Sequence, residues 1–439
     1  MDIAPEDQLH DLIAAARRAG ADAAEAHTGR SIQTKVAVRL GKLETVQREE
    51  PEGWSLRVWV GARSASLASI DFSDRTKRDA LVERALTMAR LAPEDPHSGL
   101  APADLVRSIS VEDEAPLQLF DPTEPRAANL EEIARTVEAA ALAVKGVTNS
   151  YGGEATSSHS HQWRLTSDGF VGCSRRSWFS LSTSAIAGEN GVMEVDGYGR
   201  GAPWREDLPA AEQIGAEAGR RAVDRLGARK LATTRAPVIF ERRLSMAILR
   251  PYLSAINGGS VARGSSFLKH RLGERVFAPG IRVMDDPTLV RGLASRLVNS
   301  EGLPAKPWVL VDDGVLTGWI TDVASARQLG LTPNGLGVTN LTMEPGADNL
   351  ETLMAQAGTG LLVTNLFGPS LNPQTGDWSA GASGVWFEKG GPAYPVNEIT
   401  VAGCLPDFYA RLIPGSDLVI EASTNAPSLL IDAVSIAGA

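Results

Sequence analysis

Histidines are the first residues to test for metal chemistry, and the chain has six of them. None begins a His-Glu-x-x-His pair or lies near a Cys-x-x-Cys pair, the sequence signatures of common zinc sites. His159 and His161 alternate along a predicted strand, so both could reach one Zn²⁺ or Cu²⁺ on the same face. A third ligand is lacking, and Ser157, Ser158 and Gln162 surround the pair. An exposed polar strand is therefore favoured over a metal site.

The candidate nucleophiles are two cysteines and one serine. Cys404 has no histidine after His270 to activate it, and Cys173 follows a predicted turn without a partner base. Ser383 stands in Ala-Gly-Ala-Ser-Gly, where the glycine after the serine is one position too early for a Gly-x-Ser-x-Gly elbow. A predicted strand follows Ser383 directly, whereas an elbow leads into a helix. These patterns argue against a hydrolase nucleophile at all three positions.

Glycine-rich and carboxylate-rich segments give no catalytic motif either. Residues 257–260 and 335–337 contain glycine but lack a Walker lysine or a dinucleotide fingerprint. Asp285-Asp286-Pro287 and Asp312-Asp313-Gly314 lie beside apolar strands, where such sequences are typical of turns.

Periodic apolar residues predict the elements that would position these side chains. A helix is expected after residues 5–7, another capped by Asp74, and further ones over residues 130–144, 210–226, 242–256, 322–329 and 350–357. Turns at 167–169 and 189–191 should close hairpins. After residue 230, short apolar runs alternate with Gly and Pro, which is typical of paired sheets or a distorted barrel. The predicted fold class is α+β, with N-terminal α/β units that contain antiparallel hairpins (domains 1–105 and 106–230) and a β-rich C-terminal domain (231–439).

Composition limits the kinds of partner. The formal net charge of -10 argues against nucleic acid, because phosphate neutralisation needs clustered Lys and Arg. The one basic run, from Arg220 to Lys230, alternates with acidic residues at helical spacing and is interpreted as a solvated helix face. Because the chain has only two cysteines, a reducing compartment is favoured. Because no signal sequence and no membrane span is found, a cytoplasmic location is expected.

A succession of local patterns resembles the TldD/PmbA family, once called modulators of DNA gyrase. Each pattern is weak alone, and their order makes the resemblance strong. It is clearest from about residue 160 onward. The patterns include Thr166-Ser-Asp-Gly-Phe170, Ser265-Ser-Phe-Leu-Lys-His-Arg-Leu-Gly273, Val283-Met-Asp-Asp-Pro287, Ser325-Ala-Arg-Gln-Leu-Gly330, Val338-Thr-Asn-Leu-Thr-Met343, Thr375-Gly-Asp-Trp-Ser379 and Tyr394-Pro-Val-Asn-Glu398.

The resemblance also implies what this chain lacks. Family members of the TldD kind carry His-Glu-x-x-x-His on a helix, whose histidines hold a metal ion while the glutamate activates water. Here Arg250, Pro251 and Ala255 stand at about those positions, and none of them can ligate a metal ion or accept a proton at neutral pH. Residues 421–426 also lack the family's C-terminal cysteine ligand. The chain is therefore similar to the PmbA branch, also called TldE.

Members of that branch pair with a TldD subunit in a heterodimeric metallopeptidase that cleaves unfolded peptides in a shared cavity. The resemblance thus implies a non-catalytic subunit without catalytic residues, metal or cofactor of its own, and Zn²⁺ or a similar metal ion in the partner. Gly and Asn allow a peptide to approach the backbone closely, so segments rich in them are candidates for lining the shared cavity. Ordinary turns explain these segments equally well. The candidates are Asn257, Gly258, Gly259, Thr339, Asn340, Asp377 and Ser379.

Two other functions stay open. One is a stand-alone metal-dependent peptidase that uses His159 and His161. The other is a regulatory protein-binding module, as the older family name suggests. A homodimer of this chain in the absence of the partner is also compatible with the sequence.

Overall fold

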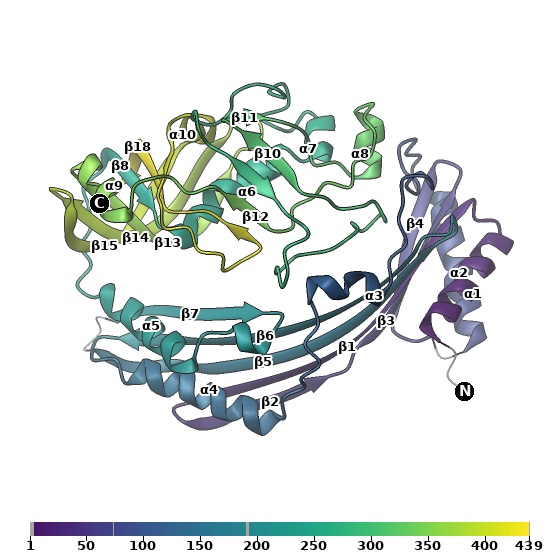
Figure 1. Cartoon of the computed structure of the whole chain (residues 1–439), viewed down its shortest axis with the longest axis horizontal. Coiled ribbons are helices and arrows are strands. Elements are labelled where there is room, and N and C mark those ends of the chain that lie inside the picture. Colours follow the sequence, from purple (N-terminus) through teal and green to yellow (C-terminus); the bar gives the residue numbers. More distant parts are fainter. Residues whose placement is uncertain (1–3, 73, 190–192, 439) are drawn as a thin grey trace.

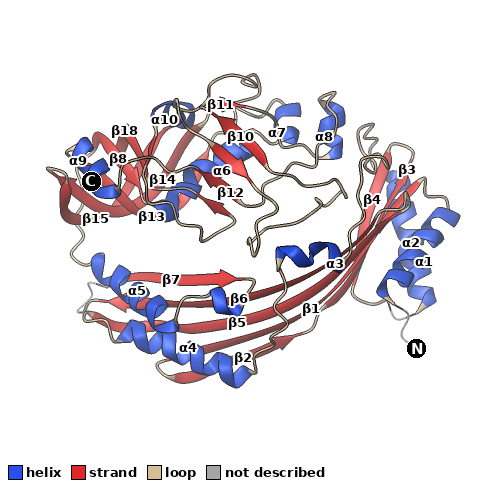
Figure 2. Cartoon of the chain, viewed as in Figure 1, coloured by secondary structure: helices blue, strands red, loops and turns tan. Residues whose placement is uncertain are grey.

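The computed structural model describes residues 4–72, 74–189 and 193–438. A long curved sheet with its helices forms the N-terminal part of the chain (Figure 1). A β-rich domain, from residue 234 onward, lies over the concave side of this sheet (Figure 2). The predicted α+β fold class is confirmed.

The curved sheet consists of seven antiparallel strands. They are β1 (Ala23–Arg39), β2 (Lys42–Glu49), β3 (Glu52–Val60), β4 (Arg63–Ser69), β5 (Val147–Thr166), β6 (Val171–Ala187) and β7 (Glu194–Ala202). Their order is β4-β3-β1-β5-β6-β7, and β2 pairs with β1. Since β1 pairs with β5 from Glu25 to Val38, strands of the first two predicted domains share one sheet. The domain limits themselves stay a prediction.

Four helices cover one face of the curved sheet. They are α1 (Pro5–Arg18), α2 (Arg75–Leu91), α4 (Ala127–Leu142) and α5 (Ala211–Asp224). Alternate residues of the strands, among them Val36 and Ala155, are buried with Leu130 of α4 and Ile214 of α5. The predicted cap of α2 is confirmed, because the Asp74 side chain accepts a hydrogen bond from a backbone N–H of the first turn.

The opposite face of the sheet carries small and polar side chains. Ser31 of β1 lies directly opposite Ser160 of β5, and paired residues point to the same face. Arg164 of β5 belongs to this face and donates a hydrogen bond to the backbone oxygen of Ser300 in the C-terminal part. The polar face is therefore directed toward the C-terminal domain.

A closed sheet forms the centre of the C-terminal domain. It contains β8 (Thr234–Phe240), β13 (Gly360–Leu371), β14 (Asp377–Glu388), β15 (Gly391–Cys404) and β18 (Leu429–Ala437). Their order is β15-β14-β13-β8-β18, and pairing of β15 with β18 closes the ring, while β16 (Ile413–Pro414) extends from β18. The predicted β-rich domain with a distorted barrel is confirmed.

A second, smaller sheet and short helices pack around this barrel. The sheet has the order β11-β10-β9-β12-β17, with bounds Val315–Leu316, Trp308–Asp312, Val283–Asp285, Leu341–Met343 and Thr424–Asn425. Tyr252 and Tyr409 are fully buried between the layers, and Tyr409 Oη donates to the backbone oxygen of Ile248 at 2.9 Å. The helices are α6 (Ser245–Ala255), α7 (Gly258–Ala262), α8 (Val323–Gln328), α9 (Leu350–Ala357) and α10 (Leu405–Arg411), and α3 (Val111–Glu114) precedes them in the chain.

Two predicted turns are confirmed. Gly169, with φ +92°, closes the hairpin between β5 and β6. Asp313 and Gly314, with φ +47° and +78°, connect β10 and β11. The third predicted turn includes Asn190 and Gly191, which lie outside the described residues. Within the described ranges, no helix is long and apolar enough to cross a membrane.

Candidate functional site

Helix α6 contains Arg250, Pro251 and Ala255, where the family resemblance predicts the positions of a TldD-type metal motif. Pro251 and Ala255 are buried in the main core of the C-terminal domain beside Tyr252, whereas Arg250 is exposed. Proline has no backbone N–H to donate within the helix. The buried side of α6 at these positions is therefore hydrocarbon, with no atom that could bind a cation.

The segment after α6 uses its polar and small residues to make a turn. The Asn257 side chain caps α7 by accepting a hydrogen bond from the Ser260 N–H, and Gly258 N–H donates to Ile320 O at 2.7 Å. A Cβ at Gly258 would lie 2.8 Å from Ser325 Oγ, so glycine permits close packing on α8. Gly259 is half-buried. A peptide contact for Asn257, Gly258 and Gly259 stays a prediction.

Thr339 and Asn340 are buried in the C-terminal domain. Thr339 donates to the Asp285 carboxylate through its N–H and its hydroxyl, each at 2.6 Å. Burial raises the pKa of Asp285, and the bonds from Thr339 oppose that rise. Asn340 donates to Asp286 O and to Ser295 Oγ. Both side chains thus hold neighbouring loops together.

Asp377 and Ser379 lie at the start of β14. Asp377 is exposed and accepts a hydrogen bond from Thr375, while Ser379 is half-buried opposite Ala402 of β15. Among the described residues, no hydrogen bond joins this pair to the segment at 257–259 or to Thr339 and Asn340. The cavity candidates therefore form three separate groups.

An open hollow of about 660 Å³ lies on the polar face of the curved sheet. Its floor includes Gly29 and Ser31 of β1, Gly53 of β3 and Ser160 of β5. A Cβ at Gly53 would meet no atom within 4 Å, so the strand surface there is open. Sequence reasoning missed this hollow, because the glycines and serines come from strands that are distant in the chain.

His159 and His161 point to the helix-covered face of β5 and make different contacts. His159 packs between the rings of Phe120 and Phe179. The Nε2 atom of His161 lies 3.1 Å from the sulfur of Cys173. Burial and then Arg175 lower the pKa of His161 to about 4, and burial raises the pKa of Cys173 to about 11. At neutral pH this is an uncharged imidazole and thiol pair, which is unlike an activated thiolate.

The basic run at the end of α5 is only partly solvated, so its interpretation as a solvated face is wrong for Arg221 and Arg225. The Arg221 side chain is 8% exposed and lies 4.1 Å from the centre of the Tyr198 ring. Arg225 Nε donates to Glu194 at 3.0 Å. Arg220, which is 57% exposed, does fit the interpretation. The physical reason is that β7 packs against this helix and supplies the partners.

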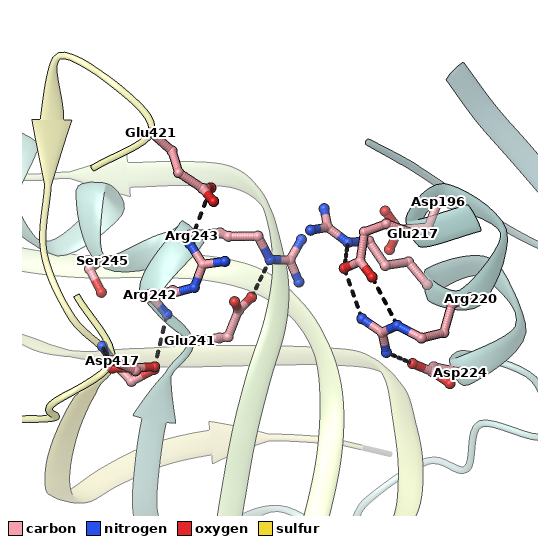
Figure 3. Close-up of polar contacts among 12 residues, drawn as sticks. Asp196, Glu217, Arg220, Asp224, Glu241, Arg242, Arg243, Ser245, Asp417 and Glu421 are labelled. Atoms are coloured by element: carbon pink, nitrogen blue, oxygen red, sulfur yellow. Dashed lines mark hydrogen bonds and ion pairs between the residues drawn. The ribbon is translucent and has the colours of Figure 1, made fainter. Parts of the chain in front are cut away.

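Ion pairs also join the curved sheet to the C-terminal domain. Glu421 lies 2.8 Å from Arg200 of β7 and 3.1 Å from Arg242 after β8. Figure 3 shows the contact between Glu421 and Arg242. Arg291 pairs with Glu206 and Asp207 at 2.7 Å and 2.9 Å. The two parts of the molecule therefore meet through charged side chains.

Comparison with known sequences assigns the chain to a family. Three models of PmbA/TldA metallopeptidase match it: domain 1 at residues 29–89, the central domain at 120–226 and the C-terminal domain at 233–438. Metalloprotease PmbA of Escherichia coli O157:H7 is 35% identical, over 95% of this chain and 92% of that protein. The chain belongs to the PmbA/TldD family. A Metalloprotease PmbA homolog of Haemophilus influenzae is 32% identical, over 99% of this chain and 97% of the relative.

Solved structures of the PmbA/TldD family share the fold along the whole chain. A protein of Bacteroides thetaiotaomicron, whose name associates it with modulation of DNA gyrase, has a TM-score of 0.92 at 26% identity and covers 99% of both chains. TldE from Thermococcus kodakarensis has a TM-score of 0.83 at 18% identity, over 98% of this chain and all of that one. The latter shows the common fold alone.

The metalloprotease names of the relatives imply a metal ion, which the residues of this chain do not fit. In α6, Arg250, Pro251 and Ala255 offer a guanidinium, a pyrrolidine ring and a methyl group. Across the part of the chain that the structure describes, no group of three or more His, Cys, Asp and Glu residues is placed to hold a metal ion. No catalytic step through a metal ion follows from these residues.

Proposed function

We propose that this chain is the non-catalytic subunit of a two-subunit metallopeptidase of the TldD/TldE type. A TldD-like partner holds the metal ion, Zn²⁺ or a similar one, and supplies the general base. The proposal rests on one observation about α6: the side chains of Arg250, Pro251 and Ala255 offer neither a metal ligand nor a general base. Membership of a family of named metalloproteases supports a role in proteolysis.

The proposed substrates are unfolded peptides in the cytoplasm. An extended peptide can be held through its main chain by a strand-rich surface, independent of its side chains. The hollow on the polar face suits this role, because Gly53 leaves its floor open and Ser31 and Ser160 provide hydroxyl groups. The three groups of cavity candidates, around Asn257, Thr339 and Asp377, are part of the same proposal.

The test is a peptidase assay with the two subunits purified separately. This chain, a TldD-like partner and an equimolar mixture are each given an unstructured fluorogenic peptide. We expect rapid cleavage by the mixture, loss of that cleavage with a chelator, and no cleavage by this chain alone. Metal analysis should find about one bound ion per heterodimer and none on this chain in isolation.

A matched pair of variants separates this proposal from a stand-alone peptidase. His161→Gln removes one of the two histidines that such an enzyme would use, and His97→Gln is the control in a half-buried turn. The mixture should keep its cleavage rate with either variant. Chelator-sensitive cleavage by this chain alone, lost in His161→Gln but not in His97→Gln, would contradict the proposal and favour the stand-alone enzyme.

A further inference from the structure

A charged cavity lies between the curved sheet and the barrel, separate from α6. It has a volume of about 460 Å³ and is lined on one side by α5 and β7, and on the other by the segment after β8 and by β13, β14 and β15. Figure 3 shows Arg243 on the barrel side, paired with Glu241, pointing toward Glu217 of α5. This volume lies within the range of small-molecule sites, roughly 300–1,000 Å³.

The charges that line the cavity are balanced. Five arginines and five carboxylates contribute to its wall. Several are paired with one another: Glu217 accepts from Arg220 and Arg221, and Arg243 Nε lies 2.5 Å from Glu241. A site for phosphate would need an excess of positive charge. A balanced wall instead suits a ligand that carries one charge of each sign.

Buried polar atoms in the wall lack good partners. Ser383 of β14 is 3% exposed, and its hydroxyl has no hydrogen-bond partner among the described residues. Nη1 of Arg225 makes no hydrogen bond there either, and it lies 3.6 Å from a carboxylate oxygen of Asp196. Leaving such groups unpaired is costly, so a polar ligand in the cavity would be stabilised by them.

The remaining wall is apolar. Leu362 of β13, Val385 of β14 and Val396 of β15 line the cavity on the barrel side. These side chains would contact the carbon atoms of a ligand whose ends are charged. A short peptide has this combination of a carboxylate, an ammonium group and a hydrocarbon body.

We propose that this cavity binds a short zwitterionic peptide of about two or three residues. The carboxylate of the peptide accepts hydrogen bonds from Ser383 Oγ and from the guanidinium of Arg243. Its ammonium group donates to the carboxylates of the wall, of which Glu241 is the nearest to Arg243. This is a second ligand site on the chain, and it needs neither the partner subunit nor the peptidase activity of the proposed function.

Calorimetric titration of the isolated full-length chain tests the proposal, with L-alanyl-L-alanine as the probe. We expect saturable binding of one molecule per chain. N-acetylation or C-amidation of the probe removes one charge, and each should weaken binding about tenfold or more. Inorganic phosphate should not compete. Binding of phosphate in place of the dipeptide, or no saturable binding up to about 10 mM, would overturn the proposal.

Ser383→Ala locates the binding to this cavity. The variant removes the unpartnered hydroxyl at little cost to the fold, and binding should weaken about tenfold. Ser370→Ala is the matched control, because Ser370 is an exposed serine of the neighbouring strand β13 outside the cavity wall. Equal affinity in the wild type and the Ser383→Ala variant, with unchanged thermal stability, would place the dipeptide elsewhere and refute the assignment.

Discussion

Replacing Gly215 of α5 by alanine tests how closely the two helices behind the sheet are packed. A Cβ at this position would lie 2.1 Å from the backbone oxygen of Val137 in α4 and 2.7 Å from the Ala140 Cβ. Ordinary contact begins at 3.4 Å, so the helices would have to separate by about 1.3 Å. The neighbour is backbone and cannot rotate away as a side chain could.

Two effects of opposite sign determine the magnitude. Alanine is favoured over glycine in a helix by about 1 kcal/mol. Overpacking costs about 1–3 kcal/mol, and a clash with a backbone oxygen belongs at the upper end or beyond. The net expectation for Gly215→Ala is a loss of about 2 kcal/mol in the stability of this region.

Hydrogen exchange followed by mass spectrometry is a suitable assay, because it reports the opening free energy of α4 and α5 separately. Gly391→Ala is the control, because a Cβ there would meet nothing within 4 Å. In this variant the opening free energy of α4 and α5 should change by less than about 0.5 kcal/mol. Slower exchange in α5 of Gly215→Ala, as helix propensity alone predicts, would refute the packing argument.

Three further predictions concern charged and titrating groups. Glu421→Gln should lower the free energy of unfolding by about 1–3 kcal/mol, because the carboxylate lies between Arg200 and Arg242. The control Glu52→Gln removes an exposed pair with Arg30 and should lower it by about 0.5 kcal/mol or less, as measured by thermal unfolding. Burial lowers the pKa of His161 to about 4 from 6.5, so its contribution to stability is full above pH 6.5 and is lost as the pH falls toward 4. His161→Gln should flatten that dependence in unfolding measured across this range, and an unchanged slope would contradict the assignment. Burial also raises the pKa of Cys173 to about 11, so iodoacetamide should label it much more slowly in the native chain than in the unfolded chain at about pH 8.

Local features of the fold could be predicted because their causes lie within a few residues. Asp74 caps α2 through a backbone N–H three residues ahead, and Gly169 permits the positive φ of the β5–β6 hairpin. The alternation of Gly, Pro and short apolar runs after residue 230 predicted the β-rich domain. The closure of the barrel by β15 and β18 could not be predicted, since it depends on which distant strands pair.

The candidate site was harder to predict than the fold. Thr339 and Asn340 stand in a pattern of small and polar residues that is typical of an exposed turn, yet both are buried by Asp285 and Ser295 from another segment. Arg221 belongs to a run that is typical of a solvated helix, yet it is covered by β7. In each case the burial of a polar side chain is set by a partner that is remote in the sequence.

The sequence alone determined the family resemblance and the side chains that α6 can offer, because residue type decides whether an atom can bind a metal ion or accept a proton. Only the tertiary structure decided which charges meet. Arg200 and Glu421 come from the curved sheet and the C-terminal domain, and Ser383 comes to face α5 across a cavity. Contacts between residues so far apart in the sequence depend on how whole layers pack. The local spacing of residues along the chain does not determine them.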